Sequence, residues 1–209
     1  MHASHDYFAV RSFDSDPSSL EKDLNTCQYI TRVVDLDIGH RIMNERVKCY
    51  SLHGHRVKVE LTFSFTMQQD IGYCVDFKEI KRIGGEWLDD HLDHGFIANP
   101  SDHCVIKACR DTNSKLYLMS LNGTEIYCNP TAENIAREIL IAMEILFKAY
   151  SDLKVHCVRY HETPNCFVTT YANSIGQEER QHFYTYRGAS ILEYAKAKGV
   201  FEYDDRKVA

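Results

Sequence analysis

Three histidines in the first part of the chain have the spacing of a metal site. His53 and His55 flank Gly54 at the start of a stretch that alternates apolar and polar residues, and His40 precedes them. Side chains at positions i and i+2 of a strand face the same side, so both imidazoles can converge on one ion. An antiparallel return through residues 41–52 would bring His40 alongside. Three neutral imidazoles with a vacant fourth position typify catalytic zinc, and a metal-free polar strand end is the alternative.

Cys49 and the pair Asp93-His94 could move protons. The positive charges of the metal, Arg46 and Lys48 would lower the pKa of a thiol at Cys49 and make it a base or nucleophile. A carboxylate at Asp93 that orients and charges His94 would make the imidazole a general acid. The alternatives are a small buried side chain at Cys49 and a solvated acidic helix end at Asp93-His94.

Two further motifs could bind a substrate. The carboxylate of Glu162, which precedes Thr163, can accept two parallel N–H bonds from a guanine-like edge, although a glutamate at a strand end is often only solvated. Thr131 and Glu133 follow Pro130, and they also fit a helix N-cap with an acidic first turn and no chemistry.

The elements that position these residues follow from the hydrophobic pattern. Residues 56–65 alternate as a half-buried strand, and Asp76 is a candidate N-cap for a helix that Gly84-Gly85 interrupts. Further strands are predicted over 29–38, 73–75, 154–160 and 166–171, and helices over 131–146 and 188–198. This order predicts an α+β fold with an antiparallel sheet. The stretch 96–129 is long for a connector and is expected to hold small elements of its own.

The composition excludes several classes of protein. The chain has 209 residues, 24 Lys+Arg and 30 Asp+Glu, so its net charge of −6 gives no global signal for nucleic acid or an anionic membrane. No apolar run is long enough to span a bilayer. Eight cysteines without a CxxC pair, and a first segment without an apolar signal region, predict reduced thiols and a cytoplasmic protein. Eleven histidines are the unusual number.

Taken together, the motifs resemble the 6-pyruvoyl-tetrahydropterin and 6-carboxy-tetrahydropterin synthase family, in order and over residues 28–172. They are Gly39-His40-Arg41, Cys49-x3-His53-Gly54-His55, Val75-Asp76-Phe77-Lys78, Leu92-Asp93-His94, Pro130-Thr131-Ala132-Glu133-Asn134 and His161-Glu162-Thr163. The remainder would be an N-terminal extension, 1–27, and a C-terminal extension, 173–209, with a short helix.

The resemblance implies a tunnelling fold, in which an antiparallel four-stranded sheet carries two helices on one face and trimers stack into a hexameric barrel. It implies zinc on His40, His53 and His55. Cys49, Asp93 and His94 would transfer protons, and Glu162 would anchor the pterin with Thr131, Thr163 and Glu133 nearby. The site would lie between subunits, so that Cys49 and the Asp93-His94 pair come from different chains.

Within the family, the three residues between Cys49 and His53 resemble the queuosine-pathway enzymes. This implies a lyase that converts 7,8-dihydroneopterin triphosphate to 6-carboxytetrahydropterin, acetaldehyde and triphosphate in 7-deazaguanine biosynthesis. Arg41, Arg46 and Lys48 are candidates for the triphosphate. The alternatives are a pyruvoyl-type synthase and a non-catalytic, zinc-stabilised oligomer that binds a pterin or purine.

Overall fold

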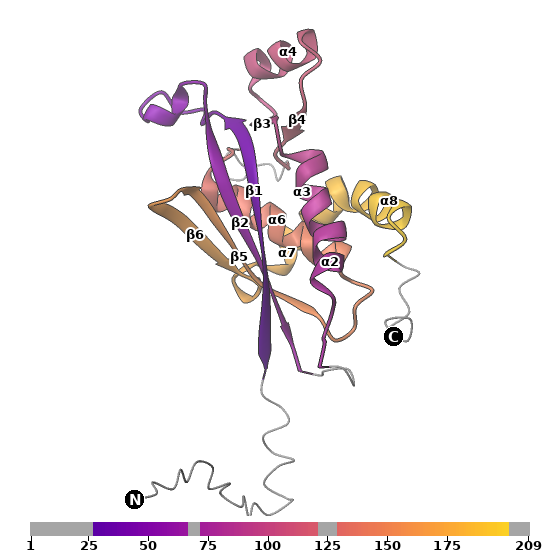
Figure 1. Cartoon of the computed structure of the whole chain (residues 1–209). Coiled ribbons are helices and arrows are strands. Elements are labelled where there is room, and N and C mark those ends of the chain that lie inside the picture. Colours follow the sequence, from indigo (N-terminus) through magenta and orange to yellow (C-terminus); the bar gives the residue numbers. More distant parts are fainter. Residues whose placement is uncertain (1–26, 67–71, 121–128, 201–209) are drawn as a thin grey trace, which may run out of the picture.

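A long antiparallel hairpin forms the centre of the computed structural model, which describes residues 27–66, 72–120 and 129–200. Strand β1 (Gln28–His40) pairs with β2 (His53–Phe65) along its whole length, from Gln28 opposite Phe65 to His40 opposite His53 (Figure 1). The alternation in β2 places Val57, Val59, Leu61 and Phe63 in the core, each at most 1% exposed. The predicted strands over 29–38 and 56–65 are therefore confirmed, and the chain does return antiparallel through residues 41–52.

The sheet is larger and more mixed than the four antiparallel strands expected. Among the described residues it has six strands in the order β4-β3-β1-β2-β5-β6. Strands β5 (Lys154–Thr163) and β6 (Cys166–Tyr171) extend it antiparallel, whereas β3 (Gly95–Ala98) and β4 (Leu116–Leu118) add parallel pairs beside β1. The two extra strands come from the stretch 96–129. They are three or four residues long, too short to show a period of two.

Two helical segments pack against one face of the sheet. Helix α6 (Ala132–Leu146) lies along it, and the other segment runs through α2 (Phe77–Ile80), the π-helical turn η2 (Lys81–Gly85) and α3 (Glu86–His91). Gly84 does not end this helix. A Cβ there would lie 3.0 Å from Met143 Sδ and 3.1 Å from Leu61 Cδ1, so the glycine allows close packing onto α6 and β2. The predicted N-cap is confirmed, because the Asp76 carboxylate accepts the Lys78 N–H at 2.8 Å.

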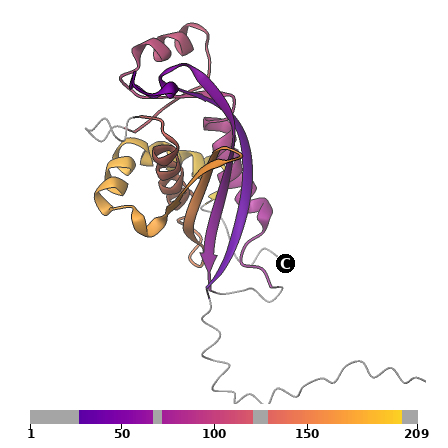
Figure 2. The ribbon, with the colours of Figure 1, turned by 90° about the vertical axis from the view of Figure 1, so that its left-hand side faces the viewer.

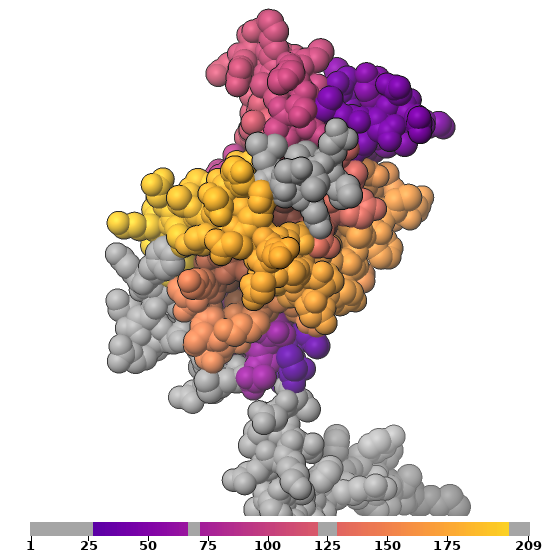
Figure 3. Space-filling model, turned by 180° about the vertical axis from the view of Figure 1, so that it is seen from behind, coloured from indigo at the N-terminus to yellow at the C-terminus, as the bar shows by residue number. Residues whose placement is uncertain are grey.

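The C-terminal segment adds a second helical layer beyond the two helices expected on the sheet, and this layer contains the helix predicted over 188–198. It comprises α7 (Gln177–Phe183), the π-helical turn η4 (Tyr184–Gly188) and α8 (Ala189–Ala197), and α6 lies between it and the sheet (Figure 2). Phe183, Ile191 and Ala195 belong to the same core as the sheet residues. Residues 173–200 therefore pack tightly on the sheet domain, and in Figure 3 they cover much of its helical side.

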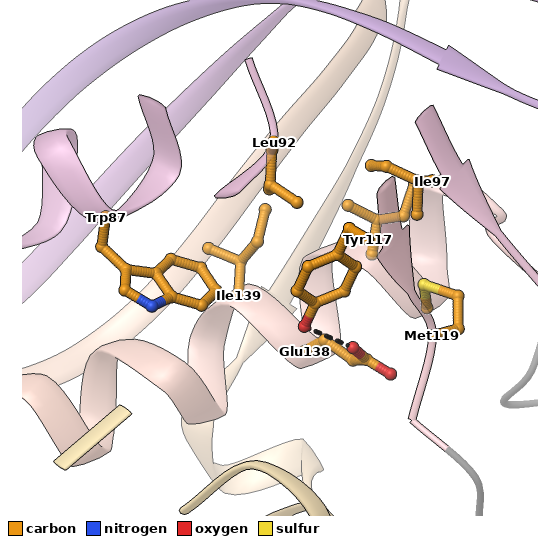
Figure 4. A pocket seen from close by; sticks show the side chains of 8 residues that line it. Trp87, Leu92, Ile97, Tyr117, Met119, Glu138 and Ile139 are labelled. Carbon is orange, nitrogen blue, oxygen red and sulfur yellow. Dashed lines mark hydrogen bonds between the residues drawn. The ribbon is translucent and has the colours of Figure 1, made fainter. Parts of the chain in front are cut away.

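The stretch 96–129 forms an insert whose described part is β3, α4 (His103–Asp111) and β4. A buried carboxylate anchors β4 to α6. Glu138 accepts a hydrogen bond from the Tyr117 hydroxyl at 2.8 Å (Figure 4). It also accepts from the Ser120 amide (2.5 Å) and the Ser120 hydroxyl (2.6 Å). Arg187 of η4 stacks on the Tyr117 ring and donates to the Leu118 carbonyl. The insert is thus fastened to both helical layers.

Two other predictions differ from the structure or lie outside it. Residues 73–75 form bends and not a strand, because three residues without a pairing partner have no ladder to join. The N-terminal extension lies outside the described residues except for Cys27, as do 121–128 of the insert. Among the described segments, no helix has the length and apolar character needed to cross a membrane.

Candidate metal and pterin site

The three predicted ligands meet where the central hairpin ends. The register sets His40 opposite His53, and His55 is two residues further along the same face of β2. Their ring centroids lie 4.6 Å (His40–His53), 4.9 Å (His53–His55) and 5.3 Å (His40–His55) apart. One nitrogen from each ring lies within 4.8 Å of the others, as a shared ion requires. Strand alternation and the hairpin together therefore build the cluster.

Backbone carbonyls orient two of these rings. Nδ1 of His40 donates to the Pro130 carbonyl at 2.8 Å, and Nδ1 of His53 donates to the Ser51 carbonyl at 2.7 Å. In the neutral rings Nε2 then carries a lone pair, and these two Nε2 atoms are only 3.1 Å apart. The pKa of His40 is lowered, chiefly by burial, which favours the neutral ring. Two lone pairs at that distance repel each other, and a cation bound between them would remove the repulsion.

The third histidine supports the same interpretation. Nε2 of His55 is buried and has no hydrogen-bond partner among the described residues. A buried polar atom without a partner is costly, and a metal ion would satisfy it. Three imidazole nitrogens suit zinc and other borderline divalent metals. The residues present therefore fit a metal ion, although the geometry does not identify which one.

Glu162 lies at the rim of the histidine cluster. Its Oε1 is 3.6 Å from Nε2 of His40 and 4.0 Å from Nε2 of His55, and its side chain is 26% exposed. Near the end of β5, Glu162 shares a strand face with the buried Tyr160. The carboxylate is therefore both next to the cluster and accessible to a ligand.

Two of the other three predicted substrate residues have hydrogen-bond partners of their own. Thr131 is the N-cap of α6, where its Oγ1 accepts the Asn134 N–H at 3.2 Å. Glu133 is an exposed acid in the first turn of that helix. Thr163 Oγ1 accepts the Asn165 N–H at 3.4 Å in the β5–β6 turn. The N-cap interpretation is correct for Thr131, and its location beside Pro130 keeps it close to His40.

Asp93 and His94 form the expected hydrogen-bonded pair. His94 Nδ1 donates to Asp93 Oδ2 at 2.6 Å, while Asp93 Oδ1 accepts the Asp37 N–H at 2.7 Å. His94 has a positive φ of 51°, and its own amide donates to the Asp37 carbonyl. The hydrogen bond to Asp93 raises the pKa of His94. Burial disfavours ionisation of Asp93, but the bonds from Asp37 and His94 prevail and lower its pKa.

The structure keeps this pair apart from the histidine cluster within one chain. Asp37, which holds Asp93, is three residues from His40 on β1, or about 10 Å at the rise of a strand, and its side chain faces the other side of the sheet. Cys49 is half-buried in the one-turn 3-10 helix Lys48–Tyr50 of the connection 41–52. Its thiol is not part of the cluster. The seven cysteines within the described residues are free thiols.

The sequence did not point to two residues, Asp102 and Asn129, that lie beside the site. Asp102 is 1% exposed and receives two hydrogen bonds from Arg41, and the Asn129 side chain accepts the Met43 N–H. A signal existed for Asp102, because an Asp before an apolar helical run is an N-cap signature and it does cap α4. Because the Arg41 guanidinium is already paired with Asp102, a structural role for Arg41 is favoured over triphosphate binding.

The fold and the cluster agree with the family whose model matches the chain. Residues 29–173 match the model for 6-pyruvoyl tetrahydropterin synthase, which is more than half of the chain. The chain therefore belongs to the 6-pyruvoyl tetrahydropterin synthase family.

Two relatives narrow the comparison within the family. A 6-carboxy-5,6,7,8-tetrahydropterin synthase of Rickettsia typhi is 37% identical over 141 residues, which cover 66% of this chain and 96% of the relative. The protein of the same name from Haemophilus influenzae is 27% identical over 143 residues and is covered to 94%.

Two solved structures support the fold alone. An uncharacterized protein of Wolinella succinogenes superposes with a TM-score of 0.54 at 22% identity, over 70% of this chain and 99% of its own. The Caenorhabditis elegans 6-pyruvoyl tetrahydropterin synthase superposes with a TM-score of 0.50 at 17% identity, over 70% and 96% of the two chains. The sequence relatives indicate a pterin synthase of this family, and the two structures agree with its fold.

Proposed function

We propose that this protein is a zinc-dependent 6-carboxy-5,6,7,8-tetrahydropterin synthase. It would convert 7,8-dihydroneopterin triphosphate and water to 6-carboxytetrahydropterin, acetaldehyde and triphosphate, as a lyase of 7-deazaguanine and queuosine biosynthesis. The observation that carries this proposal is the 37% identity to a protein of that name over 96% of its length. The oriented histidine cluster, which a metal-dependent reaction needs, supports it.

His40, His53 and His55 would hold the zinc, with their tautomers set by the carbonyls of Pro130 and Ser51. When bound, zinc supplies a Lewis acid that stabilises negative charge developing on the side-chain oxygens of the substrate. Glu162 would accept two parallel N–H bonds from the pterin ring and so direct the ring toward the cluster.

Proton transfer would fall to Cys49 and His94. As a thiolate, Cys49 would remove a proton from the substrate side chain. His94, whose raised pKa keeps more of it protonated near neutrality, would donate a proton while Asp93 holds its Nδ1. Because one chain keeps these groups apart, we further propose a homohexamer whose site combines residues of neighbouring subunits. Thr131, Thr163 and Glu133 would line the pterin pocket.

Incubation of the zinc-loaded protein with 7,8-dihydroneopterin triphosphate and identification of the product tests the proposal. Equal amounts of 6-carboxytetrahydropterin and acetaldehyde are expected. A 6-pyruvoyl product would show the pyruvoyl-type reaction instead, and absence of turnover with tight pterin binding would show a binding protein.

Cys49→Ala is the matched control for the chemistry. It should abolish turnover while metal content and assembly persist, because the thiol lies outside the histidine cluster. Full activity of Cys49→Ala would contradict the proton-transfer assignment.

A further inference from the structure

The connection 41–52, which carries Cys49, and the insert lie side by side at one end of the molecule. Figure 1 shows the connection beside α4, and Figure 3 shows the same contact from behind. The connection exposes several apolar residues, namely Met43, Val47, Tyr50 and Leu52. Because it buries little apolar surface of its own, its conformation depends on the few polar contacts that fasten it.

The strongest of these contacts joins Arg41 to Asp102. Nε of Arg41 donates to Oδ2 at 2.8 Å, and its NH2 group donates to Oδ1 at 2.9 Å. The side chain of Asp102 is 1% exposed and that of Arg41 16% exposed. A paired, fork-shaped contact of this kind fixes direction as well as distance, and water screens it little.

Arg41 and the residue after it contact Tyr50 and the backbone of Cys49. The Arg41 guanidinium lies over the Tyr50 ring, with Cζ 4.9 Å from the ring centroid. The next residue, Ile42, donates its N–H to the Cys49 carbonyl at 2.8 Å. Holding Arg41 in place therefore also holds the segment of the connection that carries the thiol.

A second set of hydrogen bonds joins the insert to the connection through Asn129. Its side-chain oxygen accepts the Met43 N–H and the Asn99 amide, each at 3.1 Å. Asn99 is buried and lies at the start of the insert, directly after β3. Two buried polar residues of the insert thus help to hold the connection. Asp102 acts through Arg41, and Asn99 acts through Asn129.

We propose that the insert serves as a clamp in which Asp102 is the positioning residue that holds Cys49 in place through Arg41. The clamp itself consists of the Arg41–Asp102 pair and the stacking of Arg41 on Tyr50. Its effect on turnover rests on the proposed function, in which Cys49 removes a proton. Among the described residues, Asp102 makes no hydrogen bond or ion pair with the histidine cluster or with the thiol. It therefore acts only through Arg41.

Asp102→Asn separates the clamp from helix capping. The Asp102 carboxylate also accepts the Val105 N–H at 3.3 Å at the start of α4, and asparagine caps equally well. Its amide group, however, cannot accept from Arg41, so the paired contact is lost. Arg41→Lys is a second variant that keeps the charge and loses the fork. Lys107→Met is the control, because it removes the exposed Lys107–Asp111 pair elsewhere on α4.

The first readout is the alkylation rate of Cys49 by iodoacetamide in the metal-loaded protein, followed by peptide mass spectrometry. Exposed Cys166 is the internal reference. Asp102→Asn and Arg41→Lys should each raise the Cys49 rate about tenfold, equivalent to about 1.4 kcal/mol, without changing that of Cys166. The double variant should be no faster than either single one, because both remove one interaction. Lys107→Met should match the parent.

The second readout separates the clamp from the proposed function. With an active enzyme, Asp102→Asn should lower kcat and leave KM and metal content unchanged. An unchanged Cys49 alkylation rate in both folded variants would overturn the clamp, whatever the activity. Loss of metal without faster alkylation would also overturn it, because Arg41 would then act on His40. If alkylation rises as expected but no pterin is turned over, the clamp stands and the proposed function falls.

Discussion

Replacing Glu138 by alanine should destabilise the protein by about 3–5 kcal/mol, because it leaves buried hydrogen-bond donors without their acceptor and opens a cavity. Glu138 is buried and accepts one hydrogen bond from the Tyr117 hydroxyl (Figure 4) and two more from the amide and hydroxyl of Ser120. Removing the acceptor of the buried Tyr117 hydroxyl alone costs about 1–3 kcal/mol. The cavity left by the shortened side chain and the loss of both Ser120 bonds account for the rest.

Urea unfolding at fixed protein concentration, followed by circular dichroism, measures this change. In a thermal scan it corresponds to a fall in Tm of about 6–20 °C, at about 2–4 °C per kcal/mol for a domain of this size. The matched control is Glu138→Gln, which keeps the volume and offers one oxygen and one amide donor. It should cost less than the alanine variant, because it leaves no cavity and keeps one acceptor oxygen.

The pH dependence gives a second check. Burial raises the pKa of Glu138 despite its hydrogen bonds. The folded state therefore binds the proton more tightly than the unfolded state, so this group's contribution to stability falls as pH rises from the ordinary glutamate pKa toward the raised one. Glu138→Gln lacks this slope, so its stability relative to the parent should rise with pH. An alanine variant as stable as the glutamine variant would refute the network's role.

Three further predictions concern the site. His53→Ala should lower bound metal substantially in elemental analysis, and undiminished metal would refute the ligand set. Asp93→Asn should shift the alkaline limb of the kcat–pH profile to lower pH, because the carboxylate raises the pKa of His94, which must be protonated to donate; an unshifted limb would exclude His94 as the acid. Gly54→Ala should lower metal affinity, because its Cβ would lie 2.6 Å from the Ile38 carbonyl oxygen and force β2 away from β1, and metal titration followed by calorimetry would detect the loss.

Local patterns carried most of the fold prediction. The alternation in β2, the Asp76 and Thr131 caps and the apolar stripe of α6 all express contacts within a few residues, and the structure confirms each. The mixed edge of the sheet was not predictable in this way. Strands β3 and β4 are three or four residues long, and their pairing depends on the distant β1 and on Glu138 of α6. Such pairings leave no periodic trace in a single sequence.

For the site, the sequence by itself indicated the histidine cluster. His53 and His55 share a face because a strand has a period of two, and the hairpin they begin makes His40 their neighbour. Tertiary structure decided the rest. It set the tautomers of His40 through Pro130, brought Glu162 to the rim, and kept Asp93 and His94 away from the cluster. It also joined Arg41 to Asp102 across a separation of 61 residues. Those contacts depend on where whole elements dock, which the packing of the complete core determines.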